Sequence, residues 1–224
     1  MQTDPLLDKQ TVFVIDDDEA VRESIAALVD IRGLPVETFA SGEDFLAAYS
    51  GVAPGCVVTD LRIEHGMTGL ELQVALRERG CKIPVIVISA YANVSNAVQA
   101  MNNGAITLLE KNCSSEDLWK AIIEALATDS DLRAANLEHR TLIQRFEQLK
   151  PEELVVMQGV IDGQLNKVIA KDLSLSLRTV ESRRHNVLEK VGVSSIPELV
   201  RLCVALEQAV GQAPIQYLMD RADS

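Results

Sequence analysis

The sequence predicts a doubly wound α/β domain with a five-stranded parallel sheet, then a long helical linker, then an all-α domain of four helices. Residues 8–127 alternate short apolar runs with helical patterns, which is typical of a parallel sheet with crossover helices. Residues 115–149 contain neither Pro nor Gly, and four short helical patterns with turn residues between them follow. We therefore expect domains over 8–127 and 147–210, joined by a linker over 128–146.

Composition agrees with two globular domains. The chain has 224 residues, of which 47% are apolar and 24% charged. The net charge of −12 lies mostly in the first half, which argues against indiscriminate coating of nucleic acid but leaves the second half free to carry a local basic surface. The four cysteines lack zinc-type spacing, and no apolar run is long enough to cross a bilayer. Since residues 1–5 show no secretory signal, we expect a cytoplasmic protein without membrane contact.

The first half divides into five β/α units. Apolar, β-rich runs predict strands at 11–15, 35–39, 56–59, 84–88 and 106–109. Helical patterns follow each strand, with Gly33 as a natural stop for the first helix and Ser41 as a cap for the second. Ser114, with Asp117 three residues later, resembles a capping box that starts the fifth helix.

Reactive side chains follow four of these strands. They are Asp16 with Asp17, Asp60, Ser89 and Lys111. Because the carboxyl ends of parallel strands meet in one crevice, we expect these groups to converge. Carboxylates that crowd together favour a divalent cation such as Mg²⁺ (or Mn²⁺), and a carboxylate such as that of Asp60 can accept a phosphoryl group. The ordinary alternatives are that Ser89 is a strand-end hydroxyl or a helix cap, that Lys111 is a solvated surface residue, and that Asp18 and Glu19 favour a helix N-terminus.

The first half resembles the receiver domain of two-component response regulators through VFVIDDDEAVRESI, VVTDLR, PVIVISA and LLEK. The resemblance implies a flavodoxin-like fold in which Asp60 is the phosphoacceptor and a histidine kinase donates the phosphoryl group. It also implies that Asp16, Asp17, Asp60 and the backbone carbonyl of Arg62 hold the metal. Ser89 would be the switching hydroxyl, and Lys111 would pair with the phosphate.

Some positions depart from the receiver pattern. Asn112 follows the lysine where a proline is common, and Leu108 stands at the switch position where an aromatic residue is usual. The loop after Asp60 reads IEHGMTG, where a shorter, proline-bearing version is typical. These departures leave the metal and phosphoacceptor residues intact. They affect the residues that would couple phosphorylation to a change in the shape of the domain. They support an alternative in which the receiver is a dimerisation or interaction module that acts without phosphate.

The linker is expected to continue the fifth helix as a semi-rigid connector. Thr128-Asp129-Ser130 is the candidate break in it. Its apolar side chains could pair with a second chain or pack on the protein's own domains, and the sequence favours neither.

The second half contains a helix-turn-helix pattern. The first helix starts at Pro151, Asn166 is expected to cap the second, Ser176 caps the third, and Gly192 ends the third. A fourth helix follows Ser194-Ser195, and the tail 211–224 predicts nothing firm. The third helix places a polar face opposite its apolar stripe, which suits a DNA major groove, although a helical bundle with a solvated charged face has the same pattern.

The segment GQLNKVIAKDLSLSLRTVESRRHNVLEKVGVSS resembles the LuxR-type helix-turn-helix of the NarL/FixJ family. Glu181, Ser182 and His185 occupy positions that read bases in relatives. The DNA-binding set expected here is completed by four basic residues and one hydroxyl: Lys167, Arg178, Arg183, Lys190 and Thr179. Arg184 lies in the apolar stripe and is expected to reach a phosphate or an acid. The segment LKPEE departs from relatives, which usually have Thr before the proline and Arg after it.

Together these features predict a phosphorylation-dependent transcriptional regulator. Its partners would be a sensor histidine kinase and double-stranded promoter DNA, and it would form a homodimer on activation. Its only reactions would be Mg-dependent transfer to its own Asp60 and slow self-dephosphorylation. A phosphohydrolase is disfavoured because the sequence shows no additional nucleophile, base or substrate loop.

Overall fold

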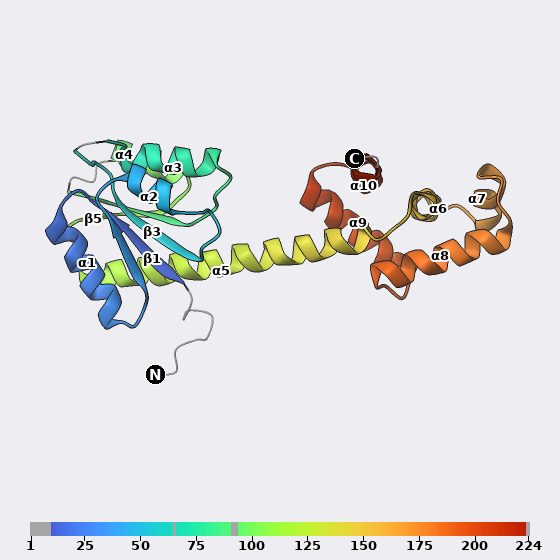
Figure 1. Ribbon diagram of the computed structural model, residues 1–224, viewed down its shortest axis with the longest axis horizontal. Helices are drawn as coiled ribbons and strands as arrows, with labels where there is room; N and C mark the ends of the chain where they lie inside the picture. The colour runs from blue at the N-terminus through green and yellow to red at the C-terminus, as the bar shows by residue number, and fades with distance from the viewer. Residues whose placement is uncertain (1–9, 65, 91–93, 223–224) are drawn as a thin grey trace. The chain divides into compact units, whose positions relative to one another are not determined.

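The computed structural model describes residues 10–64, 66–90 and 94–222 (Figure 1). The chain divides into two compact units, Met1–Ala134 and Ala135–Ser224. Among the described residues, no helix has the length and apolar character needed to cross a membrane.

The first unit is built on a five-stranded parallel sheet with strand order β2-β1-β3-β4-β5. The strands lie within one or two residues of the predicted runs: β1 Thr11–Ile15, β2 Val36–Phe39, β3 Gly55–Asp60, β4 Val85–Ser89 and β5 Ala105–Glu110. The crossover helices are α1 Glu19–Ile31, α2 Gly42–Ala48, α3 Gly69–Glu78, α4 Val94–Asn102 and α5 Ser115–Phe146. This is the expected doubly wound α/β fold.

Both faces of the sheet are covered, which explains why the central strands read as continuous apolar runs. α1 and α5 lie on one face, and α2, α3 and α4 lie on the other (Figure 1). Strand β3 is buried along its whole length between β1 and β4. Its two ends are therefore rigidly placed, and its carboxyl end carries Asp60.

The candidate break in α5 does not form. The helix runs unbroken from Ser115 to Phe146, through the Thr128-Asp129-Ser130 segment. Asp129 is 2% exposed, and its Oδ2 accepts hydrogen bonds from the backbone N–H of Gly55 at 3.0 Å and from Gln10 Nε2 at 3.2 Å. The side chain that suggested an interruption instead ties the helix to the amino-terminal ends of β1 and β3.

Arg133 completes this attachment one turn later. Its Nε lies 2.7 Å from Asp129 Oδ2. Its two terminal nitrogens donate to the carbonyl oxygens of Val52 at 2.8 Å and Ala53 at 2.7 Å. We call Gln10, Asp129 and Arg133 the α5 anchor. It holds the helix against the sheet edge opposite the carboxyl ends of the strands.

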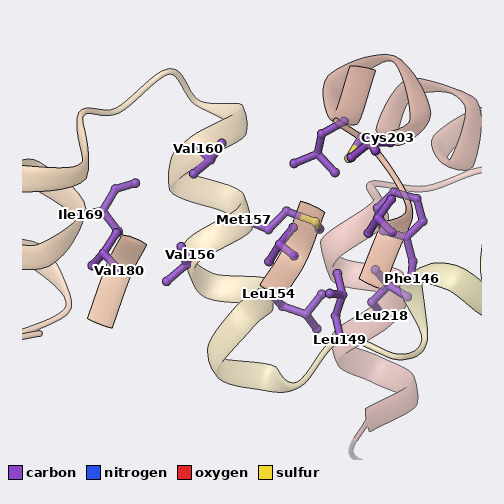
Figure 2. Packing of buried hydrophobic residues seen from close by; sticks show 14 of the residues in the cluster. Phe146, Leu149, Leu154, Val156, Met157, Val160, Ile169, Val180, Cys203 and Leu218 are labelled. Carbon is purple, nitrogen blue, oxygen red and sulfur yellow. The ribbon is translucent and has the colours of Figure 1, made fainter. Parts of the chain in front are cut away.

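The second unit contains five further helices: α6 Pro151–Ile161, α7 Asn166–Asp172, α8 Leu177–Val191, α9 Ile196–Val210 and α10 Pro214–Ala222. The end of α5 supplies Phe146 to their shared core, where it lies near Leu149 and Leu218 (Figure 2). The predicted cap at Asn166 is wrong, because Asn166 is the first residue of α7 and Leu165 occupies the cap position without a side-chain bond. The caps at Ser176 and Gly192 are confirmed.

The tail forms a helix that the sequence did not reveal. In α10, Leu218 is 4% exposed and packs into the core of the second unit. The helix contacts both α6 and α9. The tail has few apolar residues among polar ones, and this local pattern did not predict a helix. The helix is stabilised by the surface of α6 and α9 that it covers.

Candidate functional site

Three carboxylates meet at the carboxyl ends of β1 and β3. Asp16 and Asp17 follow β1, and Asp60 is the last residue of β3. One oxygen from each lies within 4.8 Å of the others. Asp16 is fully buried, Asp60 is nearly so, and Asp17 is half-buried. Three like charges this close repel one another unless a cation lies among them.

Lys111 supplies positive charge at the same place. Its Nζ lies 2.7 Å from Asp16 Oδ2 and 2.7 Å from Asp60 Oδ2. Its backbone N–H donates to the carbonyl of Ser89 at 2.8 Å, which continues the pairing of β4 and β5 past the end of the sheet. Lys111 therefore bridges two of the three carboxylates and is not a solvated surface residue.

The charged groups of this cluster shift one another's pKa values. Burial raises the pKa of Asp16, and the Lys111 ammonium opposes part of that rise. Burial lowers the pKa of Lys111, but hydrogen bonds to Asp16 and Asp60 outweigh it, so the pKa of the ammonium is raised. Lys111 thus stays protonated and can face an anionic group that arrives at Asp60.

Backbone amides aim the carboxylates. Asp16 Oδ1 accepts from the N–H of Asp18 at 2.9 Å, and Asp60 Oδ1 accepts from the N–H of Arg62 at 3.1 Å. Asp17 Oδ2 accepts from the N–H of Glu64 at 3.1 Å. Asp18 lies at the N-terminus of α1, as the alternative interpretation of the acidic run expected, and it also caps the helix, accepting from the N–H of Ala20 at 2.9 Å.

Sequence reasoning missed Arg22. Its Nη1 donates to the carbonyl oxygens of Asp16 at 2.7 Å and Asp17 at 3.0 Å, and so fixes the backbone that carries both acids. A cation near a helix N-terminus is disfavoured by the helix dipole. Its position in the first turns of α1 was therefore a signal that it has a specific partner.

Gly69 makes room beside the phosphoacceptor candidate. A Cβ at this position would lie 2.3 Å from the carbonyl oxygen of Asp60, so only glycine fits without a shift of the backbone. Thr68 then caps α3, with Glu71 returning the hydrogen bond as a capping box. The unusual loop after Asp60 thus ends in a tight, capped turn, although His65 within it lies outside the described residues.

The remaining receiver positions lie around this cluster. Ser89 is buried at the end of β4, with 3% of its surface exposed. Leu108 is half-buried in β5 and packs against the core shared with α2 and α3. Lys111 and Asn112 form the turn after β5, and the peptide bonds of the described residues are all trans.

A second candidate surface lies on α7 and α8. Five of the predicted DNA-binding residues are exposed: Lys167, Arg178, Glu181, Ser182 and His185. Thr179 and Arg183 are half-buried on the same helix. The exposed members of this set on α8 share one polar face, as the helical pattern predicted.

Three basic residues of α8 contact other parts of the domain, and the longest of these contacts is that of Arg183, whose Nη1 donates to the carbonyl oxygen of Glu152 at 3.5 Å. Arg184 Nη1 donates to Asn166 Oδ1 at 3.1 Å, which gives Asn166 a role other than the predicted cap. Lys190 Nζ lies 2.6 Å from Glu153 Oε2. The structure therefore separates Lys190 from the exposed members of the predicted DNA-binding set.

Comparison with known proteins identifies both units. Residues 12–123 match the response regulator receiver domain, and residues 147–203 match the bacterial regulatory proteins of the luxR family. The chain is 36% identical over 200 residues to the transcriptional regulatory protein TdiR of Thauera aromatica, covering 89% of this chain and 88% of TdiR. It is 35% identical over 196 residues to the transcriptional regulatory protein FixJ of Bradyrhizobium diazoefficiens, covering 88% of this chain and 95% of FixJ.

Solved structures give the same picture. The response regulator StyR aligns with a TM-score of 0.79 at 38% identity, covering 87% of this chain and 98% of StyR. Full-length FixJ from B. japonicum aligns with a TM-score of 0.55 at 34% identity, covering 90% of this chain and 98% of that protein.

Proposed function

Because this chain belongs to the transcriptional response regulators that join a receiver domain to a LuxR-type DNA-binding domain, we propose that phosphorylation of Asp60 controls its binding to promoter DNA. The observation that carries the proposal is the placement of Asp60 beside Asp16, Asp17 and Lys111 at the carboxyl edge of the sheet. A nucleophilic carboxylate, a cation and paired acids are the parts that phosphoryl transfer requires.

The donor set fits a hard divalent cation. Three carboxylate oxygens within 4.8 Å of one another suit Mg²⁺ (or Mn²⁺), which prefers oxygen ligands. We propose that Asp16, Asp17, Asp60 and the backbone carbonyl of Arg62 hold it. The bound ion would neutralise charge on the transferring group. Arg22 and the N–H groups of Asp18 and Glu64 keep Asp16 and Asp17 aimed toward the ion.

The protein's own groups would then act as follows. A carboxylate oxygen of Asp60 attacks the phosphorus of a kinase phosphohistidine, and the P–N bond breaks as the new P–O bond forms. Lys111 remains protonated because its pKa is raised. Its ammonium would exchange part of its contact with Asp60 for a contact with a phosphoryl oxygen. The hydroxyl of Ser89, at the end of β4, would donate a hydrogen bond to another phosphoryl oxygen.

Activation would act through a homodimer. α4 exposes three apolar side chains at helical spacing, Val94 at 81%, Val98 at 53% and Met101 at 50%. α4 also packs on β5, which carries Leu108 and ends beside Lys111. We propose that phosphorylation changes this α4–β5 face and that two chains pair through it.

The DNA-binding domain would place α8 in a major groove. Glu181, Ser182 and His185 would contact base edges, while Lys167, Arg178, Arg183 and Thr179 would contact the backbone. A small helix-turn-helix module makes limited contact, so two copies on adjacent half-sites are expected. Promoter DNA and the kinase's phosphohistidine are cytoplasmic, and we propose the same location for this protein.

The test is analytical ultracentrifugation of the full chain with and without Mg²⁺ and beryllofluoride, which together mimic the acyl phosphate. We expect the wild type to shift from monomer to dimer and Asp60→Asn to stay monomeric. A dimer in every condition, with promoter binding unchanged in Asp60→Asn, would contradict the proposal and favour the phosphate-independent module.

A further inference from the structure

Glu153 is a buried acid at the start of α6. It is 4% exposed, and its Oε2 accepts from the backbone N–H of Lys150 at 2.8 Å. The same oxygen lies 2.6 Å from Nζ of Lys190, in the last turn of α8. The side chain of Asn186, one turn earlier on α8, contributes to lowering the pKa of this carboxylate. The acid of α6 is joined to the last turn of α8 by the ion pair with Lys190.

The interaction is between charged groups. Burial raises the pKa of Glu153, but the donors from Lys150, Lys190 and Asn186 outweigh it, so the pKa is lowered. Removing one partner of a buried ion pair leaves the other as an uncompensated charge, which is strongly unfavourable. Glu153 and Lys190 are therefore expected to act as a unit.

A second attachment lies nearer the start of α8. Arg184 Nη1 donates to Asn166 Oδ1 of α7 at 3.1 Å. α8 packs on both α6 and α7 (Figure 1). The polar face with Glu181, Ser182 and His185 is thus carried by a helix that is tied to α7 by Arg184 and to α6 by Lys190. Two ties on different sides of a helix oppose its rotation about its own axis.

We propose that Glu153 is a positioning residue for DNA recognition: through Lys190 it fixes the rotation of α8, and Lys190 serves this contact instead of binding a phosphate. The inference rests on the DNA contacts proposed above. It assigns a role to the acid of the LKPEE segment and removes Lys190 from the phosphate-binding set.

The two roles of a basic residue differ in salt dependence. Each phosphate contact contributes about 0.9 to the slope of log Kobs against log salt concentration, whatever the DNA sequence. A positioning residue contributes nothing to that slope. Its loss lowers binding to the preferred sequence while binding to random sequence is kept, because base contacts need the correct helix rotation and phosphate contacts tolerate small shifts.

The experiment uses the full chain with Mg²⁺ and beryllofluoride. Its two duplexes are one selected by the wild type from a random-sequence pool and one of scrambled sequence. The variants are Lys190→Met, Lys190→Arg and Glu153→Gln, with Arg178→Ala as the matched loss of an exposed basic residue on the same helix. Circular dichroism confirms that each variant is folded at the assay temperature, and affinity is measured across a salt series.

We expect Lys190→Met and Glu153→Gln to lower the ratio of selected to scrambled affinity by about tenfold, which corresponds to about 1.4 kcal/mol. The salt slope should not change. A variant that combines Lys190→Met with Glu153→Gln should lower the affinity ratio no more than either single substitution. Lys190→Arg should keep the wild-type ratio. Arg178→Ala should reduce the slope by about 0.9 per chain on both duplexes.

Two outcomes would overturn the inference. A slope reduced by Lys190→Met as much as by Arg178→Ala would make Lys190 a phosphate contact. A folded Lys190→Met variant with lower thermal stability but the wild-type affinity ratio would make the contact merely structural. A wild type that selects no duplex is a different result, because it would contradict the proposed function and the inference together.

Discussion

At the scale of single residues, the chemistry depends on how each charge is compensated. Asp16 has no solvent exposure, and its two oxygens are met by the N–H of Asp18 and the ammonium of Lys111. Asp17 is half-buried, and its Oδ2 accepts from the N–H of Glu64. Because Lys111 contacts two of the three acids and carries a single positive charge, the cluster can bind a further cation.

Adding Mg²⁺ should therefore stabilise the receiver. Binding to the folded state alone adds about 2.7 kcal/mol at a ligand concentration 100 times Kd, and the melting temperature rises accordingly. Asp17→Asn should abolish most of this rise in differential scanning calorimetry. Glu23→Gln, an exposed acid on α1, is the control and should keep it. An equal rise in both variants would show that the ion binds elsewhere.

Glu153 predicts how stability changes with pH. Its folded pKa is lowered by its hydrogen-bond donors in spite of burial. Folding then favours the ionised form, so the stabilisation is fully present above the unfolded pKa of about 4.3 and is lost as pH falls through the lower folded value. In the Glu153→Gln variant, the melting temperature of the second unit should fall less steeply as pH is lowered into the acid range. A fall as steep as in the wild type would be inconsistent with an ionised, paired Glu153.

At the scale of elements, α5 shows how distant partners override a local signal. Thr128, Asp129 and Ser130 favour a helix break by composition. The break is absent because the α5 anchor supplies Asp129 with donors from the start of β3 and from Gln10. Gln10 and Gly55 stand at the opposite ends of the strands that carry Asp16 and Asp60. The anchor thus holds the helix to the same two strands as the acid cluster.

Arg133→Ala should loosen the helix at this point. It leaves the Asp129 charge buried without its cation, a type of change that costs about 3–5 kcal/mol, reduced here because the side chain of Arg133 is 37% exposed. Hydrogen exchange should speed up over residues 126–134, while the exposed control Arg140→Ala should leave it unchanged. Equal protection in both variants would mean that the anchor contributes nothing to the order of α5.

At the scale of the whole molecule, the regulator joins two units that each have their own core. Under the proposed function, the signal from Asp60 reaches α8 through a change in association or in the linker. The exposed apolar side chains of α4 are the surface that the proposed function assigns to a second copy.

Val98→Lys should block dimerisation induced by beryllofluoride without loss of folding, because the side chain is already 53% exposed. A charge buried at a pairing surface disfavours association. Sedimentation velocity with Mg²⁺ and beryllofluoride should report a monomer. Ile31→Lys, at an 82% exposed apolar position on α1, is the control and should still dimerise. Dimers of Val98→Lys would place the interface elsewhere.

The sequence by itself determined the strands, most helix limits and the convergence of Asp16, Asp60 and Lys111. Apolar period, capping residues and strand ends are local properties, and the rule that parallel strands share a carboxyl edge turns them into a site. The polar face of α8 followed from helical spacing in the same way.

The continuation of the fifth helix into the linker was predicted, but the absence of a break at Thr128-Asp129-Ser130, the α10 helix, the role of Asn166 and the pairing of Lys190 depend on the tertiary structure. Asp129 binds Gly55, 74 residues away, and Lys190 binds Glu153, 37 residues away. A buried polar group takes whichever partner the fold brings within hydrogen-bond distance, and this depends on packing between elements rather than on the pattern within one. Lys190 therefore looked like a phosphate contact in the sequence, and the fold turned it toward an acid.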